Sequence, residues 1–249
     1  MATARLIVTA DDAGLHRGMT EGAIRAHREG IVTACSVVAN GVAFDDAVAR
    51  LRDVPSLEVG VHLTLVEEKP LTAMRFPRKY TTFVPLYLAR AISMRDIERE
   101  FRAQIEKVLA TGLRVTHLNS HQHLHMLPRI FSLASRLANE YEIGYVRVVN
   151  DRGGSAGLLR RLSVAALSTL GRSGRTIGVL EAGHIRDVVP LLDHVEETTE
   201  LVTHPGVGVD GYPQWNYDWE AETRALCAPG LRDELVKRGI ELIAPSASR

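Results

Sequence analysis

Residues 5–14, RLIVTADDAG, begin with the strand that decides the fold of this chain. The run Arg5–Ala10 is short and mainly apolar, with β-branched residues at its centre, which predicts a buried strand. A helical pattern follows at residues 20–29 and ends at Gly30, a residue type that favours helix termination. A buried strand followed at once by a helix is the first half of a βαβ unit, so the stretch predicts a parallel sheet.

The same alternation recurs along the chain. Seven or eight strand and helix units within 249 residues predict an α/β fold with a parallel sheet. We expect closure into a (β/α) TIM-like barrel, which leaves no exposed strand edge, and an open doubly wound sheet is the alternative. Further strands are predicted at residues 32–38, 57–65, 114–118, 145–149, 177–180, 200–203 and 240–243, and further helices at 44–52, 94–110, 127–141, 158–170 and 188–195.

Residues 66–95 interrupt this rhythm. They contain Pro70, Pro77 and Pro85 and have no clear amphipathic period, which indicates an excursion from the barrel. Long connections of this kind often cover active sites. We therefore expect residues 1–249 to form a single domain in which residues 66–95 are a candidate lid.

The composition of the chain excludes several classes of protein. Thirty basic residues balance thirty acidic ones, so the overall charge favours neither nucleic acid nor an anionic membrane surface. Cys35 and Cys227 are too few for a disulfide framework and too far apart for a metal-binding CxxC motif. No stretch has the length of a membrane span or the pattern of a signal peptide, so we expect a cytoplasmic protein. Sequence leaves a monomer and a homodimer open.

Polar side chains occur where predicted strands end. Asp11 and Asp12 follow the first strand, His62 lies near the end of the third, His121 follows the fourth and Arg147 lies in the fifth. Active sites of barrel enzymes lie at the carboxyl ends of the strands. The sequence therefore predicts an active site built from these residues.

Asp12, His62 and His121 form a candidate metal site. Two neutral imidazoles and one carboxylate suit a catalytic divalent ion that keeps positions open for water and substrate. Asp11 would then be free to accept a proton. Two alternatives remain open: the Asp pair as a turn or helix N-cap, and His62 as a core residue with its hydrogen bonds satisfied.

The stretch LNSHQHLHMLP, residues 118–128, places histidines at alternate positions. An extended chain would put His121, His123 and His125 on one side, whereas a helical turn would bring His121 and His125 together. The spacing does not choose between these geometries, and a solvated loop is a third interpretation. We assign His121 to the metal, and His123 and His125 to the substrate pocket or to the support of the ligands.

Further candidates come later in the chain. His204, in THPG at residues 203–206, can donate a proton to a leaving group because imidazole titrates near neutrality, although a turn role is equally open. His184, which follows another apolar segment, is the second candidate for the acid. Trp215 belongs to an aromatic-rich loop that can stack on a sugar or pack against the barrel. Arg147 is a candidate substrate contact because it can hold a phosphate or carboxylate.

Four motifs in order resemble one known family. TADDAG at 9–14, GVHLT at 60–64, THLNSHQHLHMLP at 116–128 and THPG at 203–206 resemble the YdjC/ChbG family of carbohydrate deacetylases and its hopanoid-associated HpnK-like branch. The resemblance implies a distorted (β/α) barrel that removes an N-acetyl group from an amino sugar. It implies Asp12, His62 and His121 as metal ligands and Asp11 as general base. The family usually has Phe where this chain has Ala13, which affects the expected substrate pocket.

These observations predict a deacetylase that uses one divalent ion. Imidazole ligands favour Zn²⁺, whereas the carboxylate and open water positions also admit Mg²⁺, the ion that the resemblance implies. The expected partner is an N-acetylated amino sugar, either an N-acetylglucosamine-containing oligosaccharide or a glycolipid. The alternatives are a metal-dependent hydrolase of another bond, such as a phosphoester, and a non-catalytic sugar- or metal-binding module.

Overall fold

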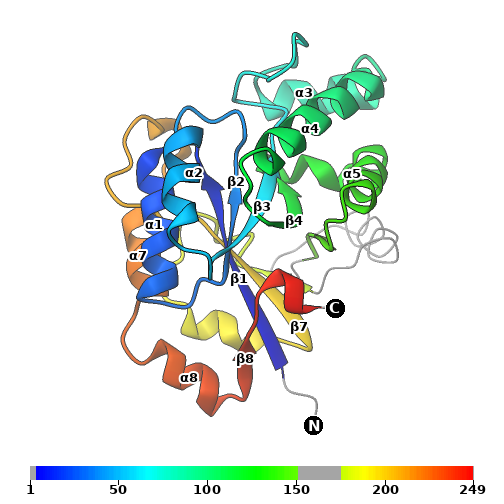
Figure 1. The fold of residues 1–249 in the computed structure, drawn as a ribbon. Helices are drawn as coiled ribbons and strands as arrows, with labels where there is room; N and C mark the ends of the chain where they lie inside the picture. The colour runs from blue at the N-terminus through cyan, green and yellow to red at the C-terminus, as the bar shows by residue number, and fades with distance from the viewer. Residues whose placement is uncertain (1–3, 151–174, 249) are drawn as a thin grey trace.

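The computed structural model describes residues 4–150 and 175–248. Its strands run parallel in one curled sheet, with helices packed around it, as predicted for a distorted TIM-like barrel (Figure 1). Along the sheet the order is β5-β4-β3-β2-β1-β7-β6, and β8 also pairs with β1. The strands are β1 (Ala4–Ala13), β2 (Ala34–Val37), β3 (Glu58–Leu63), β4 (Val115–Ser120), β5 (Tyr145–Val146), β6 (Arg175–Ile177), β7 (Thr198–Thr203) and β8 (Ile240–Leu242).

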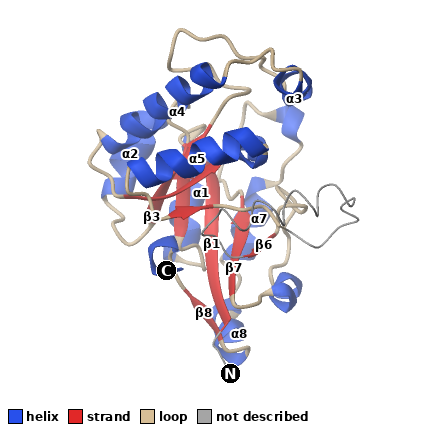
Figure 2. Ribbon diagram, turned by 90° about the vertical axis from the view of Figure 1, so that its right-hand side faces the viewer, coloured by secondary structure: helices blue, strands red, loops and turns tan. Residues whose placement is uncertain are grey.

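Helices cover the outer side of the sheet (Figure 2). The predictions at residues 44–52, 94–110 and 127–141 are confirmed as α2, α4 and α5. The prediction at 158–170 lies outside the described residues, and the one at 188–195 is corrected to a short 3-10 helix, η2, which contains a proline in its first turn. The helices are α1 (Arg17–Arg28), α2 (Phe44–Arg52), α3 (Tyr80–Leu88), α4 (Met94–Leu109), α5 (Pro128–Glu140), α7 (Trp219–Leu226), α8 (Leu231–Lys237) and the 3-10 helices η1 (His121–Met126), η2 (Val189–His194), η3 (Pro213–Trp215) and η4 (Pro245–Ser248).

The first strand organises the sheet because it pairs with three others. Residues Arg5–Ala10 of β1 pair with β7. On the other side, Ala4–Leu6 pair with β8, whereas Thr9–Ala13 pair with β2. One strand thus joins both halves of the sheet, and its carboxyl end, with the two aspartates, lies at the centre.

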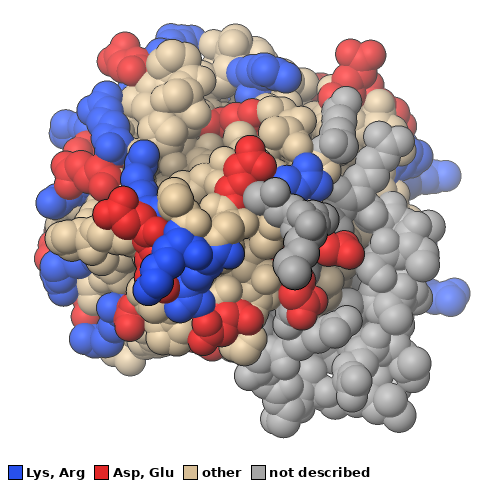
Figure 3. Space-filling view, turned by 90° about the horizontal axis from the view of Figure 1, so that it is seen from below, with Lys and Arg blue, Asp and Glu red and all other residues tan. Residues whose placement is uncertain are grey.

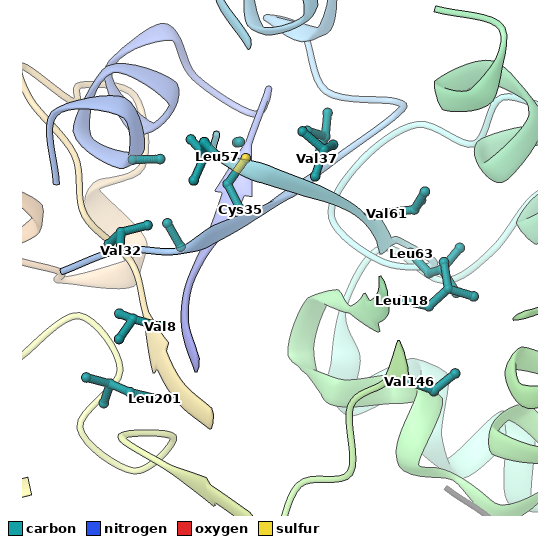
Figure 4. Packing of buried hydrophobic residues seen from close by; sticks show 14 of the residues in the cluster. Val8, Val32, Cys35, Val37, Leu57, Val61, Leu63, Leu118, Val146 and Leu201 are labelled. Carbon is teal, nitrogen blue, oxygen red and sulfur yellow. The ribbon is translucent and has the colours of Figure 1, made fainter. Parts of the chain in front are cut away.

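The two faces of β1 have different chemistry. Leu6, Val8 and Ala10 belong to the main core, which Figure 4 shows with Val8 near Leu201 and Cys35 near Leu57. Because strand side chains alternate between faces, Ile7 falls in a separate cluster with Tyr145 and Ile243. The same alternation carries Thr9 and Asp11 into the barrel interior. The interior near the site is therefore polar, and the apolar core lies between the sheet and the helices.

Residues 66–95 contain one helix, α3, which the sequence analysis did not predict. Pro85 lies inside α3, and the helix lacks the period of an amphipathic pattern. Phe83 and Tyr87 of this helix are buried in the main core, which holds α3 in place, and their rings stack on each other with centroids 6.4 Å apart. No described helix is long and apolar enough to cross a membrane.

Candidate active site

The adjacent aspartates diverge at the end of β1. In a regular strand, neighbouring side chains point to opposite faces. Here the register against β2 shifts between Ala10 and Ala13, and Asp12 has a φ of 67°, in the left-handed region. This irregularity lets both carboxylates line one cavity while each contacts a different set of partners.

Asp12, His62 and His121 converge, as the sequence analysis expected of a metal site. All three are buried, and one potential ligand atom from each lies within 4.8 Å of the others. Oδ1 of Asp12 is 3.2 Å from Nε2 of His62 and 3.1 Å from Nδ1 of His121. Two imidazole nitrogens and a carboxylate oxygen from three separate strand ends therefore fit one divalent ion.

The tautomer of His62 suits this arrangement. Its Nδ1 donates to Oδ1 of Asn119 over 2.7 Å, because an amide oxygen can only accept. In the neutral ring, Nε2 therefore keeps its lone pair and directs it towards Asp12. Hydrogen bonds of this kind fix the ring orientation of a metal-binding histidine.

A second carboxylate reaches His121 from residues 66–95. Oε2 of Glu67 lies 3.1 Å from Nε2 of His121, and Oε1 accepts from Nε2 of Gln122 over 2.9 Å. Burial disfavours a charged imidazole, but Asp12 and Glu67 raise the pKa of His121 to about 10. The surroundings thus favour positive charge, as a cation site requires. The sequence analysis missed Glu67, whose local sequence shows no motif.

Asp11 is fixed by several donors. Nη1 of Arg147 donates to its Oδ2 over 2.5 Å and Nη2 to its Oδ1 over 2.9 Å. Ser36 and Asn119 also donate to Oδ1, over 2.7 and 2.9 Å. Burial alone would raise the pKa of Asp11, but Arg147 holds it well below its usual range. The carboxylate is therefore ionised and oriented.

Arg147 lies beneath the cavity and does not line it. The side chain is fully buried, and its Nε and Nη2 also donate to Oε1 of Glu200, over 3.0 and 2.8 Å. Glu200 in turn accepts from the hydroxyls of Thr9 and Tyr145. The guanidinium is thus held between two carboxylates. The sequence analysis had placed Arg147 at the substrate and had not singled out Glu200.

The cavity at the carboxyl ends of the strands has a volume of about 570 Å³. It brings together seven of the predicted residues, one of which is His123, whereas His125 and His184 do not line it. His184 is exposed, with its ring centroid 5.9 Å from that of Tyr217. The other six are Asp11, Asp12, His62, His121, His204 and Trp215.

His204 and His123 each present a polar atom that no described residue contacts by a hydrogen bond. Nδ1 of each is buried and lacks a hydrogen bond to the described residues. His204 follows β7, and its backbone N–H donates to Oε1 of Glu222 over 2.5 Å. His123 has a φ of 52°, next to Gln122 at 54°. Burial lowers the pKa of both imidazoles, so both are neutral near pH 7.

His125 has a structural environment. Its Nδ1 is 2.6 Å from Oγ of Ser120, and its Nε2 is 3.0 Å from the carbonyl oxygen of Arg147. A carbonyl only accepts, so Nε2 carries the proton and Nδ1 accepts from Ser120. Burial lowers the pKa of His125 to about 3. The residue links β4 to the segment around Arg147.

Aromatic rings form one wall of the cavity. The ring of Trp215 lies 5.3 Å from that of His121, 4.7 Å from that of Tyr212 and 5.8 Å from that of Tyr217. Nε1 of Trp215 is buried and has no partner among the described residues. The wall thus offers an apolar surface with a buried donor that no described residue engages.

Comparisons with known proteins indicate the family of this chain. The sequence profile of the family described as YdjC-like protein matches residues 5–237. The chain is 34% identical to a carbohydrate deacetylase of Brevibacillus brevis over 81% of both chains. It is 31% identical to a chitooligosaccharide deacetylase of Citrobacter koseri over 95% of this chain and 96% of the relative.

A solved structure supports the fold. A putative cellobiose-phosphate cleavage protein from Enterococcus faecalis superposes with a TM-score of 0.80, covering 99% of both chains at 22% identity. At this identity the likeness concerns the fold alone. The profile match spans most of the chain, and both relatives exceed 30% identity over more than two thirds of their length. The chain therefore belongs to the YdjC-like family, within which its relatives are carbohydrate deacetylases.

Proposed function

We propose that this protein is a metal-dependent hydrolase that removes an N-acetyl group from an amino sugar. The observation that carries the proposal is the separation of Asp11 from Asp12 at the end of β1. One carboxylate joins two histidines in a metal-ligand set, and its neighbour is ionised, oriented and open to the same cavity. Two relatives named as deacetylases of carbohydrates support this choice of reaction.

Asp12, His62 and His121 would hold one divalent ion, Zn²⁺ or Mg²⁺. When bound, such an ion polarises a carbonyl oxygen and lowers the pKa of a coordinated water. Two imidazole ligands favour Zn²⁺, and carboxylates favour Mg²⁺. Glu67 supports the set by holding His121 from its other ring nitrogen.

Asp11 would accept the proton of the attacking water. Its four hydrogen bonds orient the carboxylate before the substrate arrives, which is the geometric requirement for a general base. Arg147 is a positioning residue in this scheme, because it contacts Asp11 and lies outside the cavity. His125 supports Arg147 through the carbonyl oxygen of that residue.

His204 would donate a proton to the departing amine. Its unpartnered Nδ1 belongs to a side chain that lines the cavity, whereas exposed His184 does not reach it. Burial lowers the pKa of His204, so the neutral ring would first take up a proton from solvent, and the protonated ring would then be a stronger acid towards the amine. His123 and Trp215 would contact the sugar, the first by hydrogen bonding and the second by stacking.

The structure gives weaker support to the alternative function, hydrolysis of a phosphoester. Arg147, the candidate phosphate contact, is engaged by Asp11 and Glu200 below the cavity. A non-catalytic binding module would leave the oriented carboxylate of Asp11 without a role. We therefore put deacetylation first.

Acetate release tests the proposal directly. The protein is stripped with a chelator, reloaded with Zn²⁺ or Mg²⁺, and incubated with N-acetylglucosamine oligosaccharides and with an N-acetylglucosamine glycolipid. We expect acetate only with reloaded protein and at least one of these substrates. Phosphate release from a phosphoester under the same conditions, with no acetate from any sugar, would assign the site to the other bond.

A further inference from the structure

Residues 66–95 carry an unbalanced charge. They contain six basic residues and two acidic ones, Glu67 and Glu68, a net charge of 6 − 2 = +4 in a chain of net charge zero. All six basic side chains are exposed, and none of them forms an ion pair with a described residue. They are Lys69, Arg75, Arg78, Lys79, Arg90 and Arg95.

Basic residues elsewhere are often paired with acids. Arg50 bridges Glu21 and Asp46, and Arg102 bridges Glu98 and Glu140. The face seen from below in Figure 3, far from α3, shows blue and red side chains next to one another. The concentration of unpaired positive charge is therefore a local property of residues 66–95.

The two acids of this segment do not offset its outer charge. Glu67 turns towards the site, where it contacts His121 and Gln122. Glu68 is about half-buried, and this burial raises the pKa of its carboxyl group. The six exposed basic side chains therefore have no fully exposed acid of their own segment beside them, although Asp210 of a later loop lines a cavity with Arg78 and Lys79.

Apolar side chains are exposed in the same segment. Leu88 is 67% exposed, Leu86 38% and Leu71 37%. Phe83 and Tyr87 hold α3 to the body of the protein, so Leu86 and Leu88 stand on an anchored helix. Figures 1 and 2 both show α3 at the upper end of the molecule, away from the amino ends of the strands. We call the six basic residues together with these three leucines the excursion surface.

We propose that the excursion surface docks the protein onto an anionic lipid bilayer. Exposed leucines beside a cluster of Lys and Arg match a membrane interface, where apolar groups enter the headgroup region and cations bind lipid phosphates. Pairing with a second copy through the same surface would place net +4 against +4. Tyr80 of this segment also lines the cavity, so docking would bring the cavity opening near the bilayer. This proposal is independent of the reaction at the metal site.

Vesicle sedimentation tests the proposal with the full chain and no sugar present. We expect binding to vesicles of phosphatidylcholine mixed with phosphatidylglycerol, little binding to phosphatidylcholine alone, and release at high salt. The triple variant R75E/R90E/R95E should bind the anionic vesicles at least ~100-fold more weakly, since each basic residue contributes about 1 kcal/mol. L88S should weaken binding by a smaller factor.

Matched variants separate docking from general charge. R28E/R114E/R129E makes the same charge change at exposed residues outside the segment that have no ion pair with a described residue, and V236S removes another exposed apolar side chain. Both should keep wild-type vesicle binding, and thermal melting checks that every variant is folded. Equal loss in the two triple variants, equal binding to neutral vesicles, or binding to an oligonucleotide or a second copy but not to vesicles would overturn the proposal. Acetate release from a water-soluble sugar tests the deacetylase assignment separately.

Discussion

The floor and the rim of the cavity are built in opposite ways. On the floor, Asp11, Arg147 and Glu200 have their charges paired and are almost completely buried. On the rim, Gln122 and His123 adopt left-handed backbone conformations, and Nδ1 of His123 has no partner among the described residues. The floor is therefore oriented before a ligand binds, whereas the rim stores strain and leaves polar atoms for the ligand.

The largest effect is expected on the floor, at Asp11. Replacing Asp11 with Asn removes the proton acceptor but keeps the shape, so kcat should fall by roughly 10²- to 10⁴-fold. Metal content, measured by elemental analysis, should remain near wild type because Asp12 is intact. Asp12→Asn is the matched control and should lose metal. Wild-type kcat in Asp11→Asn with metal bound would remove Asp11 from the role of base.

Replacing Arg147 tests whether the buried charges of the floor stabilise the folded protein. Arg147→Met leaves Asp11 and Glu200 as unpaired buried carboxylates, so the free energy of unfolding should fall by about 3–5 kcal/mol. Urea denaturation measures this change. Arg102→Met removes a partly exposed arginine that bridges Glu98 and Glu140 and should cost about 1 kcal/mol or less. Equal losses in the two variants would show that the floor has no special dependence on its charge balance.

The lowered pKa values of two buried histidines predict that the protein loses stability in acid. Burial lowers the pKa of His117 to about 4 and that of His125 to about 3, against 6.5 when unfolded. The unfolded chain then binds more protons below pH 6.5, so the free energy of unfolding falls as pH decreases towards those values. By pH 5 each histidine should contribute roughly 2 kcal/mol of this loss.

Urea titrations at pH 7 and pH 5 measure the loss. The pH dependence should be shallower in His125→Gln than in wild type, and unchanged in the control His194→Gln, whose side chain is exposed. A wild-type slope in His125→Gln would mean that His125 is already charged in the folded protein.

The smallest effect is expected at the rim. Glu67→Gln keeps a hydrogen-bonding group beside His121 but removes the carboxylate charge, so metal affinity should fall by about 10- to 100-fold. Competition with a chromogenic chelator measures this affinity. Glu68→Gln changes the next carboxyl group, which forms no hydrogen bond with His121, and should bind metal like wild type. If both variants bound metal equally tightly, the rim would not support the metal ligands.

The site residues that the sequence analysis found and missed differ in a physical way. Asp12 and His121 were found because they follow predicted strands, and His62 because it lies near the end of one; parallel strands bring their carboxyl ends together. Asn119 and Glu200 lie within strands, and Glu67 lies in a segment without periodicity, so no local pattern singled them out. Their roles depend on distant neighbours, such as His121, 54 positions from Glu67, and Thr9, 191 positions from Glu200.

The sequence by itself determined the parallel α/β architecture, the order of the motifs and the chemical types of the candidate metal ligands. The strand and helix periods and the strand-end residues are local properties, and local patterns encode them. Only the tertiary structure decided that Arg147 lies beneath Asp11 between two carboxylates, that His125 is structural, and that Glu67 folds back onto His121. These contacts join segments that are distant in the sequence. Their interaction energies come from burial and charge pairing, which depend on where all the partners lie in the folded protein.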